Sequence, residues 1–233
     1  MGPPFQAVSL SERPPTLNRM STDIYLVRHG QTYGNIEQRW CGHSETALTS
    51  LGIAQAQAAG RRLASIGLTA ALSSDLSRAA DTARHALNGR AIDHALDAGL
   101  REMHYGDWED LPGADVEKQN PERLREFFFC RTSAPNGETI AALRQRTSAS
   151  FWRAVELHRG GKVLMVSHGN AMMALVAELL KLPLEATWCF QFENASITKL
   201  NVSRSGRLTV HSVNDAGHLE SLAPGTPPDF LAS

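Results

Sequence analysis

The sequence has few cysteines, no long apolar run and almost no net charge, and each absence narrows what the protein can be. Cys41, Cys130 and Cys189 are odd in number and widely spaced, which argues against a disulfide framework and favours reduced thiols. No apolar run approaches the roughly 18 residues that a membrane helix needs, and the N-terminus lacks the basic-then-apolar pattern of a secretory signal. We therefore expect a cytoplasmic protein.

The formal net charge of −1 gives no field that would attract nucleic acid or an anionic membrane. A site for an anionic ligand must therefore be built locally from a few positive side chains. As the partner we expect a small molecule and neither nucleic acid nor membrane, and we leave a homodimer open. The length of 233 residues and the hydrophobic content of 42% fit one sizeable globular domain.

The two ends of the chain differ in composition from its middle. Residues 1–22 contain Pro3, Pro4, Pro14 and Pro15 and no apolar period, which predicts a flexible N-terminal extension. Residues 221–233, rich in proline, predict a similarly irregular tail. We place the domain between them, at residues 23–220.

Within this domain, strand and helix patterns alternate. Strands are expected at residues 24–27, 70–72, 162–166, 189–193, 195–202 and 208–213. Helices are expected at 49–65, 75–87, 138–157 and 169–180, with one or two short ones after Pro112 and Pro121. Alternating elements early and strands late predict an α/β fold with a mixed, mainly parallel sheet and helices on both faces.

Two of the apolar strands end in the same way. The run IYLVRHGQT at residues 24–32 ends in Arg-His-Gly around His29, and the run VLMVSHGNA at 163–171 ends in Ser-His-Gly around His168. Ligands of open α/β sheets bind outside the carboxyl ends of the strands, so both histidines are expected at one rim. A neutral, well-oriented histidine can attack phosphorus. A single histidine at a strand end would more often be a polar residue whose hydrogen bonds are satisfied within the fold. Two strands with matching ends favour a phosphate-binding site.

A phosphoryl group also needs positive charge aimed at its oxygens. Arg28 precedes His29, and the run LSSDLSRAADTA at residues 72–83 places Arg78 in the first turn of a helix, opposite its apolar stripe. A guanidinium at that position can bind phosphate with two N–H groups. For this segment taken alone, a solvated surface arginine is the simpler interpretation.

The run LREMHYGDWE at residues 100–109 offers carboxylates for proton transfer. A general acid near neutral pH needs a partly buried carboxyl, whereas the alternative for each carboxylate is a surface salt bridge. Glu102, Asp107 and Glu109 all remain candidates on the sequence. The aromatic residues Tyr105, Trp108 and 127–129 could shape a substrate pocket, but packing of a lid on the core is the favoured interpretation.

Together, the blocks RHGQTYGN, SSDLSRAADTA, LREMHYGDWE and SHGNA resemble the phosphoglycerate mutase-like histidine phosphatase superfamily, over about residues 24–219. This resemblance implies a three-layer α/β/α sandwich and chemistry that uses neither a metal nor another cofactor. It implies that His29 is the phospho-acceptor and that Glu102 gives a proton to the leaving group. The implied phosphate pocket consists of Arg28, Arg78 and His168, with Asn35 as a further donor. We add Gly169, whose backbone can turn sharply beside a ligand.

The sequence departs from the mutases of this superfamily at several points. Tyr33-Gly34 stands where the mutases typically have a Trp before the Asn, Thr32 replaces their usual Ser, and the insertion after Glu102 is modest. These departures lean toward the phosphatase branch and a small phosphorylated metabolite as substrate. A mutase that returns the phosphoryl group to a substrate and a non-catalytic binding module on the same fold are the alternatives.

Motifs of other phosphate-handling and hydrolytic enzymes are missing. No cysteine is followed by arginine six residues later, as a cysteine-based phosphatase loop requires. The sequence contains no G-x-S-x-G elbow and no G-x-x-x-x-G-K-[ST] loop. It also has no H-E-x-x-H motif or close Cys/His cluster, so we expect no metal.

Overall fold

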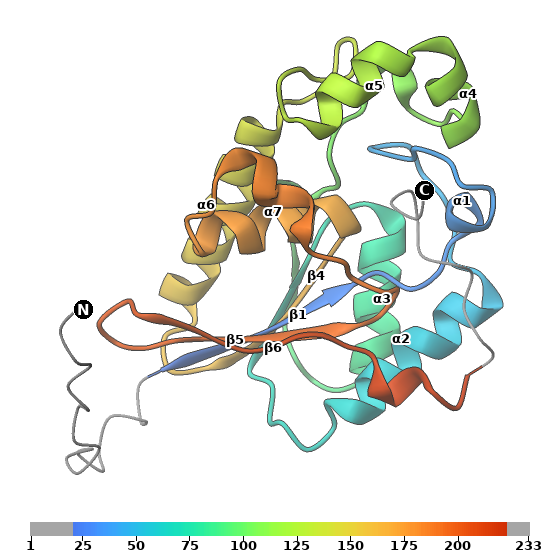
Figure 1. Ribbon diagram of the computed structural model, residues 1–233. Helices are drawn as coiled ribbons and strands as arrows, with labels where there is room; N and C mark the ends of the chain where they lie inside the picture. The colour runs from blue at the N-terminus through green and yellow to red at the C-terminus, as the bar shows by residue number, and fades with distance from the viewer. Residues whose placement is uncertain (1–20, 223–233) are drawn as a thin grey trace, which may run out of the picture.

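The computed structural model describes residues 21–222 and contains a six-stranded sheet (Figure 1). The strands are β1 (Thr22–Arg28), β2 (Ala70–Ser73), β3 (His94–Leu96), β4 (Lys162–Ser167), β5 (Ile197–Val202) and β6 (Leu208–Asp215), in the order β3-β2-β4-β1-β5-β6. β3, β2, β4 and β1 run parallel, whereas β5 and β6 are joined antiparallel to β1 and to each other. The predicted mixed, mainly parallel sheet is therefore confirmed.

Helices cover both faces of this sheet. They are α1 (Tyr33–Ile36), α2 (Ser50–Arg62), α3 (Ser77–Leu87), α4 (Gly113–Gln119), α5 (Pro121–Phe128), α6 (Ile140–Leu157) and α7 (Gly169–Leu179). α2 and α3 pack on one face and α6 and α7 on the other, so the fold is a three-layer α/β/α sandwich (Figure 1). Within the described residues, no helix combines the length and the apolar character needed to cross a membrane.

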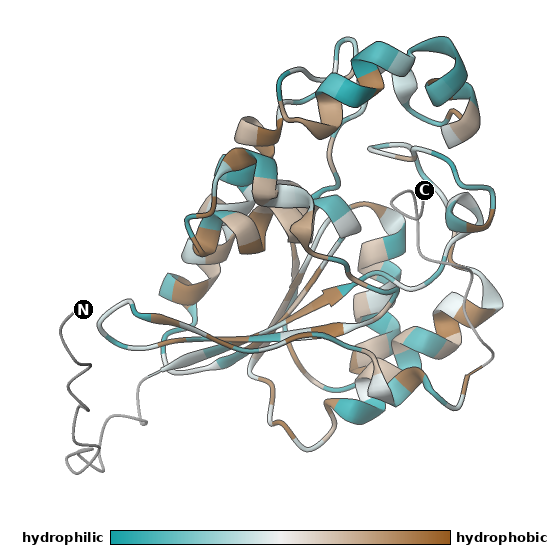
Figure 2. Ribbon diagram, viewed as in Figure 1, coloured by the Kyte–Doolittle hydropathy of each residue, from teal (hydrophilic) through white to brown (hydrophobic). Residues whose placement is uncertain are grey.

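The central strands are apolar on both sides because each side faces a helical layer. In β1, Ile24 and Leu26 are buried against the layer of α6 and α7, while Tyr25 and Val27 are buried against α2 and α3. This explains the nearly continuous apolar run in the sequence, which is typical of parallel strands with both faces covered. Figure 2 shows the corresponding concentration of hydrophobic residues along the strands in the middle of the domain.

The helix ends follow from capping residues. Thr49 accepts a hydrogen bond from the N–H of Gly52 and Thr139 accepts one from Ala142, so α2 and α6 begin just after these threonines. Asn88 adopts a left-handed conformation with φ of 47° and ends α3 at the expected place. The expected helix starts at 49, 75 and 138 were one or two residues early because the residues before each helix are not helical.

One strand prediction was wrong and one strand was missed. Residues 189–193 form no strand. Leu184–Cys189 is a 3-10 helix, and backbone groups of the segment that follows it form hydrogen bonds with side chains. The carbonyl of Phe192 accepts from Arg28 and the N–H of Glu193 donates to Asn214, which replaces a strand ladder. β3 was missed because it is a partly exposed edge strand of three residues with no apolar period.

A lid of residues 106–137, which includes α4 and α5, lies at one end of the sandwich (Figure 1). Its base is an aromatic cluster in which the ring of Trp40 lies 4.7 Å from that of Tyr105 and 5.5 Å from those of Trp108 and Phe127. Trp108 and Phe127 are almost completely buried. These aromatic residues therefore pack the lid against the rest of the domain.

The predicted domain boundaries fall close to the ends of the described residues. β1 begins at Thr22, one residue before the expected start of the domain, and the 3-10 helix Gly217–Leu219 precedes its expected end. The predicted flexible extension and irregular tail fall mostly on residues 1–20 and 223–233, which lie outside the described residues.

Candidate active site

The two strand-end histidines are neighbours across the sheet. β1 and β4 are adjacent and parallel, with Arg28 paired to Ser167, so the next residue of each strand is a histidine. The rings of His29 and His168 lie 5.1 Å apart between centroids. Both side chains are buried, with 4% and 0% of their surface exposed. The expectation that both histidines lie at one rim is confirmed.

His29 is held as a neutral imidazole with one nitrogen fixed. Its Nδ1 lies 2.7 Å from the carbonyl oxygen of Gly30. Because a carbonyl only accepts, Nδ1 carries the hydrogen and Nε2 carries the lone pair. Burial first, and then the charges of Arg78 and Arg28, hold the pKa of His29 well below its usual value. Near neutral pH, Nε2 is thus unprotonated, as an attacking nitrogen must be.

His168 presents the opposite nitrogen. Its Nδ1 accepts a hydrogen bond of 3.1 Å from Nε of Arg78, so its hydrogen sits on Nε2. This Nε2 is buried and has no hydrogen-bond partner within the described residues. Burial and the charge of Arg78 also keep the pKa of His168 well below its usual value. An unpaired buried donor is costly, and an anion beside the two rings would satisfy it.

Arg78 is buried, not solvated, and the surface interpretation of this arginine is wrong. Only 2% of its surface is exposed, because the chain at residues 42–44 covers it. Nη1 donates to the carbonyl of Ser44 at 2.9 Å and Nη2 to that of Gly42 at 2.6 Å. Among the described residues these bonds leave one N–H on each terminal nitrogen of Arg78.

Arg28 lies on the other side of His29. Its Nη1 donates to the carbonyl of Phe192 at 2.7 Å, which anchors the guanidinium beside the strand ends. Gly169, the first residue of α7, lies directly against it, since a Cβ at that position would be 3.5 Å from Nε of Arg28. Both predicted phosphate-binding residues are therefore at the rim.

Asn35 reaches the same rim through α1. Thr32 caps this short helix, and its N–H donates to Oδ1 of Asn35 at 3.0 Å. The Nδ2 of Asn194 also donates to this oxygen, at 3.2 Å, and to the carbonyl of His29 at 3.0 Å. The amide oxygen of Asn35 is thus occupied, so its Nδ2 is the group that can donate to a ligand. Asn194 was missed because it lies between the two segments predicted as strands, 189–193 and 195–202, where no motif marks it.

A close approach of two glycines sets the backbone beside His29. A Cβ on Gly30 would come within 2.3 Å of the carbonyl oxygen of Gly52, which no side chain can tolerate. The N–H of Gly30 donates to Oγ1 of Thr82 at 3.0 Å. Thr82, a second residue that the sequence did not single out, therefore links the histidine turn to α3.

The three candidate carboxylates have very different surroundings. Glu102 accepts from the N–H groups of Asn170 and Ala171 at 3.2 and 3.0 Å, so it caps the helix that starts beside His168. Asp107 is exposed and accepts from Asn136. Glu109 accepts from the N–H groups of His43 and Tyr105 and so fixes loops. Of the three, only Glu102 contacts the helix of the second histidine.

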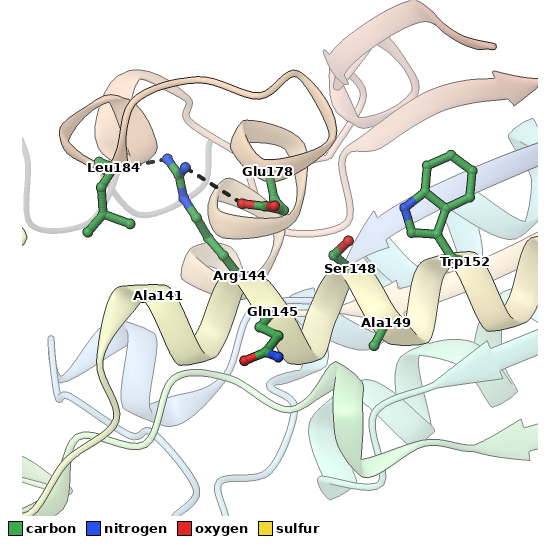
Figure 3. Close-up of a pocket in the computed structure, with 8 residues that line it drawn as sticks. All are labelled: Ala141, Arg144, Gln145, Ser148, Ala149, Trp152, Glu178 and Leu184. Carbon is green, nitrogen blue, oxygen red and sulfur yellow. Dashed lines mark hydrogen bonds and ion pairs between the residues drawn. The ribbon is translucent and has the colours of Figure 1, made fainter. Parts of the chain in front are cut away.

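A hollow with defined walls lies elsewhere. It is lined mainly by the outer face of α6, with Arg144 extending toward Glu178 and Leu184 and with Trp152 further along the helix (Figure 3). None of its lining residues comes from the strand ends that carry the histidines. In residues 21–222, moreover, no group of three or more His, Cys, Asp or Glu side chains could hold a metal ion.

The strand-end arrangement can bind and attack a phosphoryl group. Arg78 is a buried cation that makes no ion pair within residues 21–222, which favours an anionic ligand at that place. A neutral imidazole nitrogen lies beside it. The positive charge and the donors that a phosphoryl transfer requires are therefore supplied by the protein itself.

Known proteins resemble this chain over most of its length. The model of the histidine phosphatase superfamily (branch 1) matches residues 24–216. A protein of Yersinia pestis (strain Pestoides F), described as a probable phosphoglycerate mutase, GpmB, is 32% identical over 203 residues, which cover 84% of this chain and 94% of that protein.

Solved structures agree with this match. Bacillus stearothermophilus YhfR superposes with a TM-score of 0.81 at 32% identity, covering 85% of this chain and all of that one. A mycobacterial glucosyl-3-phosphoglycerate phosphatase in complex with VO3 superposes with a TM-score of 0.77 at 32% identity, covering 83% and 99%. The chain therefore belongs to the histidine phosphatase superfamily, branch 1.

Proposed function

We propose that the protein is a phosphomonoesterase that hydrolyses a small phosphorylated metabolite through a phosphohistidine on His29. One observation carries this proposal: the neutral Nε2 of His29 lies in a buried site beside the unpaired donor of His168 and the buried cation of Arg78. A bound phosphoryl group would meet a nucleophile and several donors there at once.

The reaction has two steps. Nε2 of His29 attacks phosphorus, the bond to the leaving oxygen breaks, and Glu102 gives that oxygen a proton. Water then attacks the phosphohistidine while the Glu102 carboxylate takes a proton from it, and the P–N bond breaks, which releases phosphate and restores both His29 and Glu102. In both steps Arg28, Arg78, the Nε2–H of His168 and the Nδ2 of Asn35 bind the phosphoryl oxygens.

A mutase, the second candidate, is favoured by the described relative GpmB. Hydrolysis is supported by the departures from the mutases of the superfamily at Thr32, Tyr33 and Gly34 and by the modest insertion after Glu102. The non-catalytic alternative would leave a buried nucleophile and its donors without a use.

The decisive experiment is to trap the intermediate. Purified protein is assayed against a panel of phosphomonoesters, with isomerisation of 3-phosphoglycerate run alongside. Labelled substrate is then quenched and the phosphorylated residue identified. We expect release of phosphate and an acid-labile phosphoramidate on His29. Label on a serine or cysteine would exclude the proposed nucleophile, and isomerisation without phosphate release would establish the mutase.

The acid is tested with two leaving groups. An alkoxide needs a proton to depart, whereas nitrophenolate is stable without one. Glu102→Gln should therefore slow hydrolysis of an alkyl phosphate by roughly 10²–10⁴-fold and that of p-nitrophenyl phosphate far less. Equal losses on both substrates would remove Glu102 as the acid.

The phosphate pocket predicts independence from metals. Because Arg28 and Arg78 supply the positive charge, activity should survive exhaustive chelation, and vanadate, which mimics pentacoordinate phosphorus, should inhibit. Activity that is lost on chelation and recovered with a divalent cation would contradict this.

A further inference from the structure

We propose that Arg146 is a positioning residue for proton transfer, because it holds the backbone of Glu102 and thereby sets where the Glu102 carboxyl meets the leaving oxygen. This inference rests on the proposed function, in which Glu102 is the acid. Arg146 lies near the start of α6 and forms no hydrogen bond to His29, His168 or Arg78.

One side of the Arg146 guanidinium grips the segment that ends at Glu102. Nη1 donates to the carbonyls of Gly99 and Arg101 at 3.2 and 2.7 Å, and Nη2 donates to that of Glu102 at 2.7 Å. Three carbonyls within four residues are thus tied to one side chain. A substitution here releases the backbone of the acid and of the residues just before it.

The other side of the guanidinium is paired with Glu138. Nε and Nη2 reach the two carboxylate oxygens at 2.7 and 2.8 Å, the two-pronged geometry in which arginine binds carboxylates best. The two side chains are only 24% and 14% exposed. With these bonds all five N–H groups of Arg146 are used, so its orientation is fixed.

Glu138 also marks the place where the chain returns from the lid. Its N–H donates to the carbonyl of His104 at 2.8 Å, so both ends of the lid meet beside the pair. The carbonyl of Glu102 accepts a second hydrogen bond, from Nε2 of His43 at 2.9 Å. The backbone of the acid is therefore fixed by two donors, while its carboxylate is fixed by the start of α7.

Proton transfer is sensitive to such positioning. The carboxyl must come within hydrogen-bond reach of the leaving oxygen, and a displacement of about 1 Å can cost on the order of 100-fold in rate. A glutamine at position 146 can replace at most two of the five donors and lacks the charge that pairs with Glu138. The bonds to the phosphate pocket are left intact.

The test compares Arg146→Gln with Arg153→Gln on both leaving groups. Arg153 lies on the same helix and pairs with Asp97 of the same connecting segment at 2.6 Å, but it does not contact Glu102. We expect Arg146→Gln to lower kcat for an alkyl phosphate by about 10- to 100-fold and for p-nitrophenyl phosphate by less than about threefold. KM and inhibition by vanadate should stay unchanged, and Arg153→Gln should behave as the parent protein.

Equal losses on both substrates, or weaker inhibition by vanadate, would overturn the inference, because a general disturbance of the site would then explain the loss. If Arg146→Gln does not fold, Glu138→Gln decides, since it keeps the shape of the partner and removes its charge. A selective loss on the alkyl phosphate supports the inference, and an equal loss or no loss overturns it. Glu102→Gln is run alongside. If Glu102→Gln slows only the alkyl phosphate while Arg146→Gln and Glu138→Gln do not, only the positioning role fails. If Glu102→Gln slows both substrates equally, the proposed acid itself is refuted.

Discussion

Arg78 and Arg144 are both buried arginines, with 2% and 4% of their surface exposed, yet their surroundings differ in one respect. Arg144 lies under the turn after α7 and donates to the carbonyls of Leu182 and Pro183 and to Oγ1 of Thr187. Its Nη2 has several acceptors, and its Nη1, besides the carbonyl of Leu182, lies 3.9 Å from the carboxylate of Glu178. Arg78 retains an N–H on each terminal nitrogen and holds a histidine whose own donor is unpaired.

This difference separates an arginine that closes a loop from one that can bind a ligand. Burial of a cation is expensive, and a structural site offsets that cost by satisfying every donor. At Arg78 the protein leaves donors unused, and a bound anion would complete them. Unsatisfied donors, more than burial, therefore point to the phosphate site.

The largest loss of activity is expected at His29, which lies in the same site as Arg78. His29→Ala removes the nucleophile and should lower kcat on the order of 10⁴-fold or more. Because the small cavity faces a polar site, the melting midpoint should stay within a few degrees of the parent value. Activity is measured by phosphate release and folding by circular dichroism. A variant that retains activity with an intact fold would show that another residue is phosphorylated.

Arg78→Gln should separate binding from stability. Loss of a donor to the transition state costs about 10²–10³-fold in rate, so kcat/KM should fall by that order. The free energy of unfolding, measured with urea, should fall by less than in Arg144→Gln, because the lost bonds to the carbonyls of Gly42 and Ser44 are partly offset by removing the cost of burying a charge without a counter-ion. Strong destabilisation with unchanged kcat/KM would place Arg78 in the same class as Arg144.

Arg144→Gln should show the reverse pattern. The carbonyls of residues 182–184 would lose their donor, and each buried group left unsatisfied costs about 1–3 kcal/mol. We therefore expect the free energy of unfolding to fall by roughly 3 kcal/mol, while kcat/KM of the folded fraction stays within about twofold of the parent value. A loss of activity without a loss of stability would connect the hollow of α6 to catalysis.

The smallest effect is a dependence of stability on pH. In the folded protein, burial keeps the pKa of His29 and of His168 well below 6.5, so these side chains stay neutral as pH falls. The unfolded chain takes up their protons below about pH 6.5, so it binds more protons and stability decreases as pH falls through that region. His168→Gln removes one such group, and its loss of unfolding free energy between pH 7.5 and 5.5 should be smaller by about 1 kcal/mol. Parallel losses in urea titrations would mean that His168 is protonated in the folded protein.

Features with a local cause were accessible from the sequence by itself. The apolar runs that end at His29 and His168 predicted strands with both faces covered, and parallel strands bring their carboxyl ends to one rim. This determined the fold class, the mixed sheet and the pairing of the two histidines, and the order of the four motifs indicated the family. The helix ends were nearly right because capping is also local.

Only the tertiary structure decided features whose partners lie far apart in the chain. Arg78 is buried by carbonyls 34 and 36 residues earlier, and Asn194 bonds to the carbonyl of His29 across 165 residues. Glu102 was separated from Asp107 and Glu109 only by its contact with a helix that begins 67 residues later. The segment 189–193 has the composition of a strand but bonds to side chains of Arg28 and Asn214. The pattern of apolar residues indicates which side of a segment is buried. The partners of Arg78, Asn194, Glu102 and residues 189–193 depend instead on which distant donor or acceptor the fold brings next to them.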